Sequence, residues 1–167
     1  MTPGQAVDVL SALTLEDQAT IMELMNKQNI AKITSILKQR QDTILNLITE
    51  RYLKAQPDET VETVQNAYIN IAKDKDEIMY IHIIDKDNNL LGMIDIKELL
   101  QADNKTLLKD VMNKNVITLK KDNSINEATK MFSKYGFGSL PVIDNDNKIV
   151  GVVRQRDVAK LTLHFLE

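Results

Sequence analysis

The pattern of hydrophobic and polar positions in residues 80–98 of the chain returns in residues 139–157. The two stretches read YIHIIDKDNNLLGMIDIKE and SLPVIDNDNKIVGVVRQRD, so that Ile84 aligns with Ile143 and Gly92 with Gly151. In each copy an apolar run ends in an Asp/Asn/Lys turn, a second apolar run carries one glycine, and an amphipathic segment follows. This order predicts strand, tight turn, strand and helix. An internal repeat of this kind fixes the architecture before any detail does.

A further strand and helix precede each copy. Residues Tyr52–Ala55 are a short strand candidate, and Asp58, Glu59 and Thr60 supply caps for a helix that continues to Ala72. The first unit therefore reads β-α-β-β-α. It also contains a charged stretch, Lys73–Glu77, that has no counterpart in the second unit, and we expect this stretch to form a solvated loop.

The second unit repeats the same order of elements. Val116–Leu119 is predicted as its first strand, and Ser124 with Glu127 has the spacing of a capping box. The helix that follows has one apolar face, made of Ile125, Ala128, Met131, Phe132 and Tyr135. A unit of this size buries too little surface to be stable alone, so the two units are expected to pack as one domain.

Residues 5–48 have apolar positions at helical spacing. Thr14 and Asp17 suit the start of a helix over Leu15–Lys27, and Asn29 suits the start of another over Ile30–Arg40. Short helices of this kind cannot enclose a core. We expect them to pack on the following domain, on a dimer mate or within a larger helical array.

Composition and charge exclude several functional classes. The chain has 167 residues, 43% of them hydrophobic and 27% charged, as in a soluble globular protein of one domain, either alone or with an appendage. A net charge of −3 provides no basic field for nucleic acid, so no nucleic-acid partner is expected. The absence of cysteine excludes disulfides and thiolate sites. Neither a signal peptide nor an apolar run of roughly eighteen residues is visible, so a cytoplasmic location is expected.

Metal and catalytic motifs are incomplete. Asp85, Asp87 and Asn89 have the opening spacing of an EF-hand loop, but Leu90 and Ile96 stand where the loop needs Gly and Glu. These residues are better explained as a hairpin turn. The two histidines, His82 and His164, lack zinc-site spacing, and the GFG at residues 136–138 is not a dinucleotide fingerprint. We therefore expect no enzymatic activity.

The tandem of hydrophobic–Asp turns and strand glycines resembles a CBS pair, the Bateman module, over about residues 46–165. Two linkers resemble those of MgtE-type magnesium transporters: QADNKTLLKDVMN at Gln101–Asn113 and QDTILNLITERYLKAQPDETV at Gln41–Val61. The resemblance implies an α/β (α+β) fold with tandem CBS repeats packed as one domain, the first over residues 46–106 and the second over 107–167. Residues 1–45 would be a helical segment resembling the end of an MgtE N-terminal domain.

Known members of the MgtE family have a membrane domain after the CBS pair. The chain is then either the cytosolic CBS region of such a transporter or a free-standing relative. The resemblance implies a non-catalytic sensor that gates magnesium transport in response to Mg²⁺, an adenine nucleotide or both. It also implies a homodimer formed through the CBS helices and, as partner, a transporter membrane domain in the same or a separate chain. The alternatives are a ligand-free CBS scaffold for dimerisation or docking, and a stand-alone adenylate sensor.

The resemblance also implies a nucleotide site in the cleft between the repeats. ATP or another adenine nucleotide would contact Tyr80, Lys97, Glu98, Ile117, Phe137 and Pro141. Aromatic rings would face the base, the glutamate would bind the ribose hydroxyls and the lysine a phosphate. Alternatively, the two aromatic side chains only fill the core. The Thr or Ser that most nucleotide-binding members carry three residues after the strand glycine is replaced by Asp95 and Arg154.

The resemblance suggests Mg²⁺ as a second ligand, because this cation prefers carboxylates and retained waters. Of the acidic positions expected from the family, Asp157 is present. Other expected positions hold Ser124, Asn126 and Gly136 instead. Asp157 is therefore the one metal-binding candidate.

Overall fold

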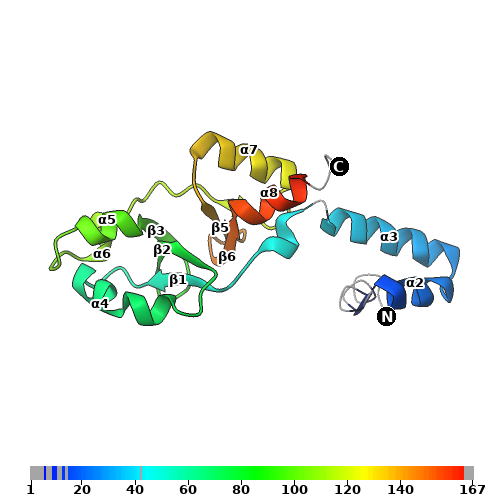
Figure 1. Ribbon diagram of the computed structural model, residues 1–167, viewed down its shortest axis with the longest axis horizontal. Coiled ribbons are helices and arrows are strands. Elements are labelled where there is room, and N and C mark those ends of the chain that lie inside the picture. The colour runs from blue at the N-terminus through cyan, green and yellow to red at the C-terminus, as the bar shows by residue number, and fades with distance from the viewer. Residues whose placement is uncertain (1–5, 7–8, 11–12, 14, 42, 164–167) are drawn as a thin grey trace.

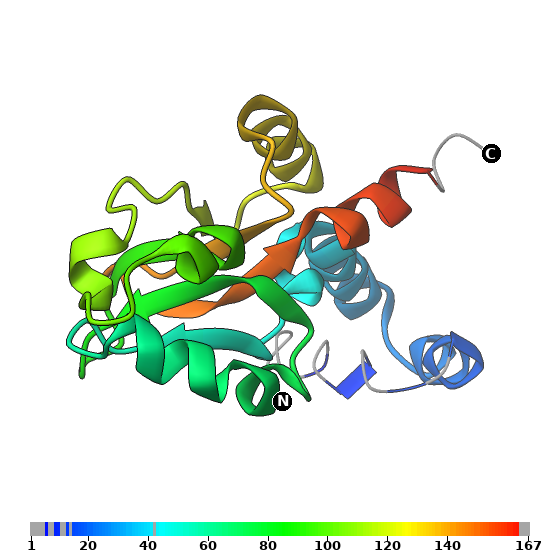
Figure 2. The same cartoon turned by 60° about the vertical axis from the view of Figure 1, so that its left-hand side comes forward.

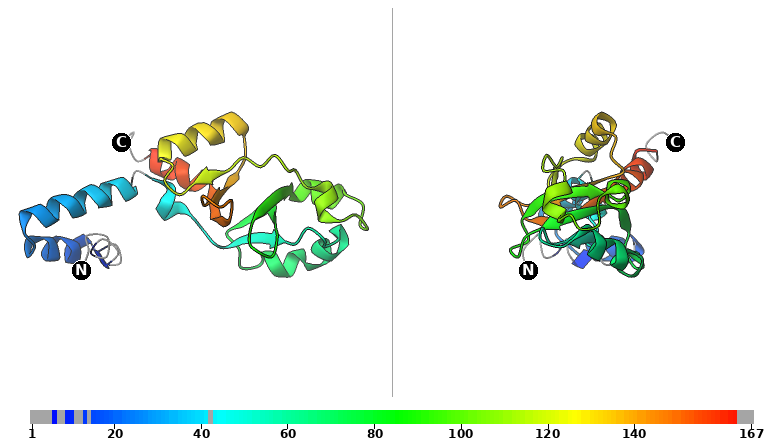
Figure 3. Two further views of the ribbon diagram at one scale, coloured as in Figure 1. Left: turned by 180° about the vertical axis from the view of Figure 1, so that it is seen from behind. Right: turned by 90° about the vertical axis from the view of Figure 1, so that its left-hand side faces the viewer.

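The computed structural model describes residues 6, 9–10, 13, 15–41 and 43–163. It has two three-stranded sheets with their helices and a separate helical arm, which follow one another along the long axis of the molecule (Figures 1 and 3). The arm consists of α2 (Leu15–Glu23) and α3 (Lys27–Gln41). The expected mixed α/β fold with tandem repeats after a helical segment is confirmed.

Each repeat has the predicted order β-α-β-β-α. The first contains β1 (Tyr52–Ala55), α4 (Val61–Ala72), β2 (Glu77–Ile84), β3 (Leu90–Asp95) and α5 (Ile96–Gln101), and α6 (Leu108–Val111) follows it. The second contains β4 (Leu119–Lys120), α7 (Ile125–Tyr135), β5 (Ser139–Ile143), β6 (Ile149–Arg154) and α8 (Gln155–Leu163). In both sheets the first strand pairs parallel with the second, and the second pairs antiparallel with the third. Helix α4 lies on the opposite side of the molecule from α7 (Figures 1 and 2).

The helix starts of the two repeats follow the predicted capping. The Thr60 side chain accepts a hydrogen bond from the Thr63 amide at the start of α4. At α7 the Glu127 amide donates to Ser124 Oγ at 3.0 Å, and the Ser124 amide donates to the Glu127 carboxylate at 2.9 Å. This is the predicted capping box. Within α7, Ala128 and Phe132 are buried.

Three boundaries differ from the prediction. Helix α2 ends at Glu23 rather than Lys27, and α3 begins at Lys27 because Asn26, not Asn29, provides the cap: its side-chain oxygen accepts from the Asn29 amide at 2.9 Å. The predicted strand at residues 116–119 is reduced to Leu119–Lys120. The predicted cap residue Thr14 lies outside the described residues, as does His164.

The two polar turns are hairpin turns, as predicted. Asn88 and Asn147 take the left-handed conformation, with φ of 67° and 62°. The turns also contact each other: the Asn88 side-chain amide donates to the Ile149 carbonyl at 2.9 Å, and the Asn147 amide donates to the Leu90 carbonyl at 3.2 Å. This reciprocal pair relates the repeats by an approximate twofold operation.

The chain crosses between the repeats, so that each leading segment packs on the other repeat's sheet. The 3₁₀ helix η1 (Ile44–Leu47) places Ile44 in the hydrophobic core of the second repeat, next to Phe132. Leu108 of α6 completes the core of the first repeat. This explains why the arm adjoins the second repeat in Figure 1 although the first repeat follows it in sequence. In the described part of the chain, every helix is too short or too polar to span a bilayer.

Candidate functional site

An aromatic pair joins the two repeats at the predicted nucleotide cleft. Tyr80 is the first residue of the continuous buried run Tyr80–Ile84 in β2, and Phe137 lies in the short connection between α7 and β5. Their ring centroids are 6.0 Å apart with an interplanar angle of 76°, an edge-to-face arrangement. The Tyr80 hydroxyl accepts a hydrogen bond from the Gly138 amide at 3.2 Å. The structure therefore brings these two predicted residues together across the contact between the two repeats, which we call the seam.

The charged members of the predicted site lie on the first turn of α5. Asp95 pairs with Tyr80 in the sheet and caps the helix, because its carboxylate accepts from the Lys97 amide at 2.7 Å. Lys97 and Glu98 therefore follow at the same end of the sheet as Tyr80. Both side chains are exposed, and neither makes a hydrogen bond or ion pair with any other described residue. They remain available to a ligand.

The remaining predicted residues come from the second repeat. Ile117 lies before β4 and, like Phe137, packs against the edge of that repeat's core. Pro141 is buried in β5, where it pairs with Val152. Ile117 and Pro141 make no polar contact that would select a ligand, so in a nucleotide site they would provide apolar walls.

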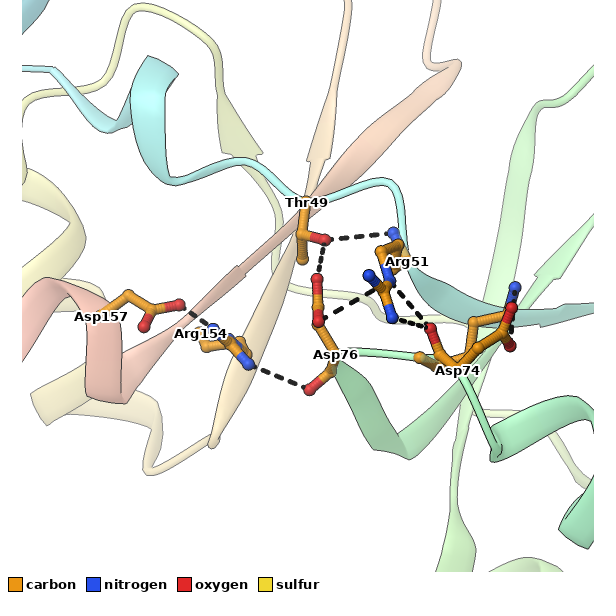
Figure 4. Close-up of polar contacts among 7 residues, drawn as sticks. Thr49, Arg51, Asp74, Asp76, Arg154 and Asp157 are labelled. Atoms are coloured by element: carbon orange, nitrogen blue, oxygen red, sulfur yellow. Dashed lines mark hydrogen bonds and ion pairs between the residues drawn. The ribbon is translucent and has the colours of Figure 1, made fainter.

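The opposite edge of the seam has a different character. Asp157, in the first turn of α8, accepts from Arg154 Nε at 2.7 Å, and both side chains are only 18% exposed. The same guanidinium donates through Nη1 to the Asp76 carbonyl of the first repeat at 3.2 Å. Figure 4 shows Arg154 lying between Asp157 and Asp76, so it joins the two repeats on this side.

The charged stretch Lys73–Glu77 is for the most part the exposed connection that the sequence predicts, but it also makes structural contacts, and its last residue belongs to β2. The Asp76 carboxylate accepts from the Thr49 hydroxyl at 2.6 Å, and the Arg51 guanidinium donates to the Asp74 carbonyl (Figure 4). Glu77 is buried as the first residue of β2. The Thr49 hydrogen bond, aided by nearby arginines, holds the pKa of Asp76 below its usual value.

Sequence reasoning noted that Arg154 replaces the usual Thr or Ser but did not find its contact with Asp76. The two residues are 78 positions apart, and no local pattern links them. The only available signal was the coincidence of an unusual cation in one repeat with an acidic insertion in the other.

The residues near Asp157 do not fit a magnesium site. Its carboxylate already pairs with a cation, and the described residues contain no group of three acidic or histidine side chains placed to hold a metal. Mg²⁺ needs several oxygen ligands in near-octahedral geometry. Metal binding by Asp157 stays a prediction.

Comparison with known proteins gives a consistent result. The CBS domain family profile matches residues 108–164. The magnesium transporter MgtE of Thermus thermophilus is 29% identical over 154 residues, which cover 90% of this chain and 34% of that protein. The chain thus spans about a third of the length of this transporter.

Two solved structures share the fold. The soluble part of a magnesium transporter superposes with a TM-score of 0.75 at 24% identity, covering 100% of this chain and 65% of that one. The cytosolic domain of the Mg²⁺ channel MgtE, solved in complex with ATP, gives a TM-score of 0.71 at 23% identity, covering 96% and 76%. The chain therefore contains a match to the CBS domain family over residues 108–164 and, as a whole, is similar in sequence to MgtE magnesium transporters and in fold to the cytosolic domain of MgtE.

Proposed function

We propose that the chain is a non-catalytic regulatory module at the cytosolic face of the membrane, where it controls an MgtE-type magnesium transporter in response to an adenine nucleotide. The single observation that carries this proposal is the unpaired Glu98 and Lys97 next to the Tyr80–Phe137 pair. One repeat thus provides a ribose acceptor and a cation for phosphate, and both repeats provide aromatic surface. The similarity to MgtE, whose cytosolic domain has been solved with ATP, supports the choice of ligand.

A nucleotide bound there would act by selecting one arrangement of the repeats. It would touch β2 and α5 of the first repeat and the α7–β5 connection of the second. A ligand that contacts both sides stabilises the arrangement in which both sets of contacts form. The partner that reads this change would be a transporter membrane domain, in the same chain or in a separate one.

Calorimetric titration with ATP tests the site. Glu98→Gln removes the charge that strengthens hydrogen bonds to the ribose, and such bonds are worth about 1.5–3 kcal/mol. We therefore expect ATP to bind roughly ten- to a hundredfold more weakly. Glu62→Gln, at an exposed position of α4, is the matched control, and this variant should bind ATP as the unchanged chain does. Equal affinities for the Glu98 and Glu62 variants would refute the site.

We also propose that the module forms a homodimer through its helices. Ile69 on α4 and Leu100 on α5 are 80% and 64% exposed. The Gln65 side chain holds these helices together by donating to the Leu99 carbonyl at 2.8 Å. A second copy would cover this apolar surface. Sedimentation should show a dimer that Ile69→Glu converts to monomer, while Lys97→Glu does not, and a monomeric unchanged chain would contradict the proposal.

A further inference from the structure

Because the repeats are duplicated, the seam between them has two equivalent edges. The side chains at these two edges make different contacts. The two aligned repeats are offset by 59 positions. Glu98 is therefore equivalent to Asp157, and Asp95 is equivalent to Arg154. Each acid lies in the first turn of the helix that follows the hairpin. We refer to the Glu98 edge as the first cleft and to the Asp157 edge as the second cleft, after the nucleotide cleft that the family resemblance implies between the repeats.

In the first cleft the acidic side chain, Glu98, makes no hydrogen bond or ion pair with another charged or polar group among the described residues. Asp95 turns back to cap its own helix, and the Glu98 carboxylate has no partner among the described residues. The segment across the cleft is the short connection at residues 136–138, which presents Phe137. A ribose could therefore reach Glu98 without displacing any protein group.

In the second cleft the equivalent acid is already occupied. Arg154 stands where the first repeat has Asp95, and its guanidinium both pairs with Asp157 and donates to the Asp76 carbonyl. A ribose that bound Asp157 would have to separate this pair. It would leave two groups, each only 18% exposed, without their partners.

The insertion in the first repeat adds to this closure. The helix caps Thr60 and Ser124 are 64 positions apart, whereas Tyr80 and Ser139 are 59 apart, so the first repeat is five residues longer between them. The extra residues provide the Asp76 carbonyl that Arg154 contacts. The insertion is fixed in turn by Thr49, whose hydroxyl donates to the Asp76 carboxylate.

We propose that Arg154 and the Lys73–Glu77 insertion hold the second cleft closed, so that the chain binds a single adenine nucleotide, in the first cleft. Arg154 thus acts as an internal occupant of the site that the repeat symmetry would otherwise duplicate. This inference rests on the proposed function for the identity of the ligand. It adds that the stoichiometry is set by one side chain of the second repeat.

Calorimetry of the 167-residue chain with ATP as the probe tests the inference. The unchanged chain should bind one ATP, and Arg154→Thr, which removes the guanidinium, should bind two. Lys160→Thr, at an exposed position of the same helix, removes an equal charge and should keep one site. Circular dichroism and thermal melting establish that each variant is folded. For the unchanged chain, ATP should shift the amide resonance of Glu98 but not that of Asp157, a result that needs no variant.

The outcomes separate the two proposals. Two sites in the unchanged chain, one site in both the unchanged chain and Arg154→Thr, or an ATP-induced shift at Asp157 would each overturn the closed second cleft alone. No site in the unchanged chain but one in Arg154→Thr would overturn the nucleotide function of the first cleft and support the closure. If neither chain binds ATP, the proposed function fails and the inference fails with it.

Discussion

A buried histidine should make the stability of this protein depend on pH well above the range in which its carboxylates titrate. His82 lies in the middle of β2 and is fully buried. Its Nδ1 donates to the Leu53 carbonyl at 3.1 Å, because a carbonyl can only accept, and its ring packs edge-to-face on Tyr52 with centroids 5.3 Å apart. Nε2 has no hydrogen-bond partner among the described residues. None of the acidic residues in the described part of the chain is placed to retain a proton on this ring.

The magnitude follows from the change in pKa on folding. Burial lowers the pKa of His82 from 6.5 to about 4, and the bond to the Leu53 carbonyl offsets this only in part. Between these two values the unfolded chain binds a proton that the folded chain does not, so the free energy of unfolding falls as the pH falls. One pKa unit corresponds to about 1.4 kcal/mol, which gives a loss of about 2 kcal/mol between pH 7 and pH 5.

Urea unfolding of the unchanged chain and of His82→Leu at pH 7, 6 and 5 measures this loss. The leucine variant should lose about 2 kcal/mol less over the range, whatever its stability at pH 7. His164 is present in both chains, so its contribution cancels. Hydrogen bonds from neighbouring residues of the turns hold the pKa values of Asp85 and Asp144 below normal. These two carboxylates therefore lose their stabilising effect only at lower pH. Parallel pH profiles for the two chains would refute the reasoning.

The strand glycines and the capping box give two further tests by urea unfolding. A Cβ at Gly151 would meet Ile48 Cγ2 and would lie 2.7 Å from the Thr49 carbonyl oxygen. At Gly92 the atoms closer than 3.0 Å belong to the flexible Met112 side chain, and the nearest backbone oxygen, of Asn113, lies 3.0 Å away. Gly151→Ala should therefore cost about 1–3 kcal/mol and Gly92→Ala clearly less, and equal losses would contradict this. Ser124→Ala should cost about 1 kcal/mol by removing the cap, while Ser133→Ala at an exposed site of the same helix should cost little, so similar losses for both would count against the cap.

The repeated fold was predictable because its local signals and its packing agree. The strand Tyr52–Ala55, both hairpin turns and the capping box at Ser124 are found where the pattern places them. The strand predicted at residues 116–119 shows where this agreement ends. Val116 and Ile117 are apolar because they pack against hydrophobic clusters, but the ladder includes only Leu119 and Lys120. Hydrophobicity records burial and does not distinguish paired from unpaired backbone.

The sequence predicted which types of residue line the candidate site, but not the contacts that these residues make with the other repeat. The cleft between the repeats and its aromatic and acidic residues follow from the repeat and from the family resemblance, and the structure brings Tyr80 and Phe137 together. The difference between the clefts depends on the contact of Arg154 with Asp76. Such a contact is formed by packing between the repeats, so it has no periodicity and no fixed spacing in the sequence.

The asymmetry of the seam bears on how a signal could leave the module. At the first cleft the repeats are joined by a neutral amide–hydroxyl contact of 3.2 Å and an aromatic pair, whereas at the second a guanidinium donates across the seam. Neutral hydrogen bonds contribute about 0.5–1.5 kcal/mol and those of charged groups about 1.5–3 kcal/mol, with solvent reducing the latter at exposed positions. The aromatic pair adds about 0.5–1.5 kcal/mol at the first cleft, so the two edges are joined by different kinds of contact of similar strength. A nucleotide bound at the first cleft would act on the aromatic and neutral contacts of that edge, while Arg154 holds the other edge by its own hydrogen bond.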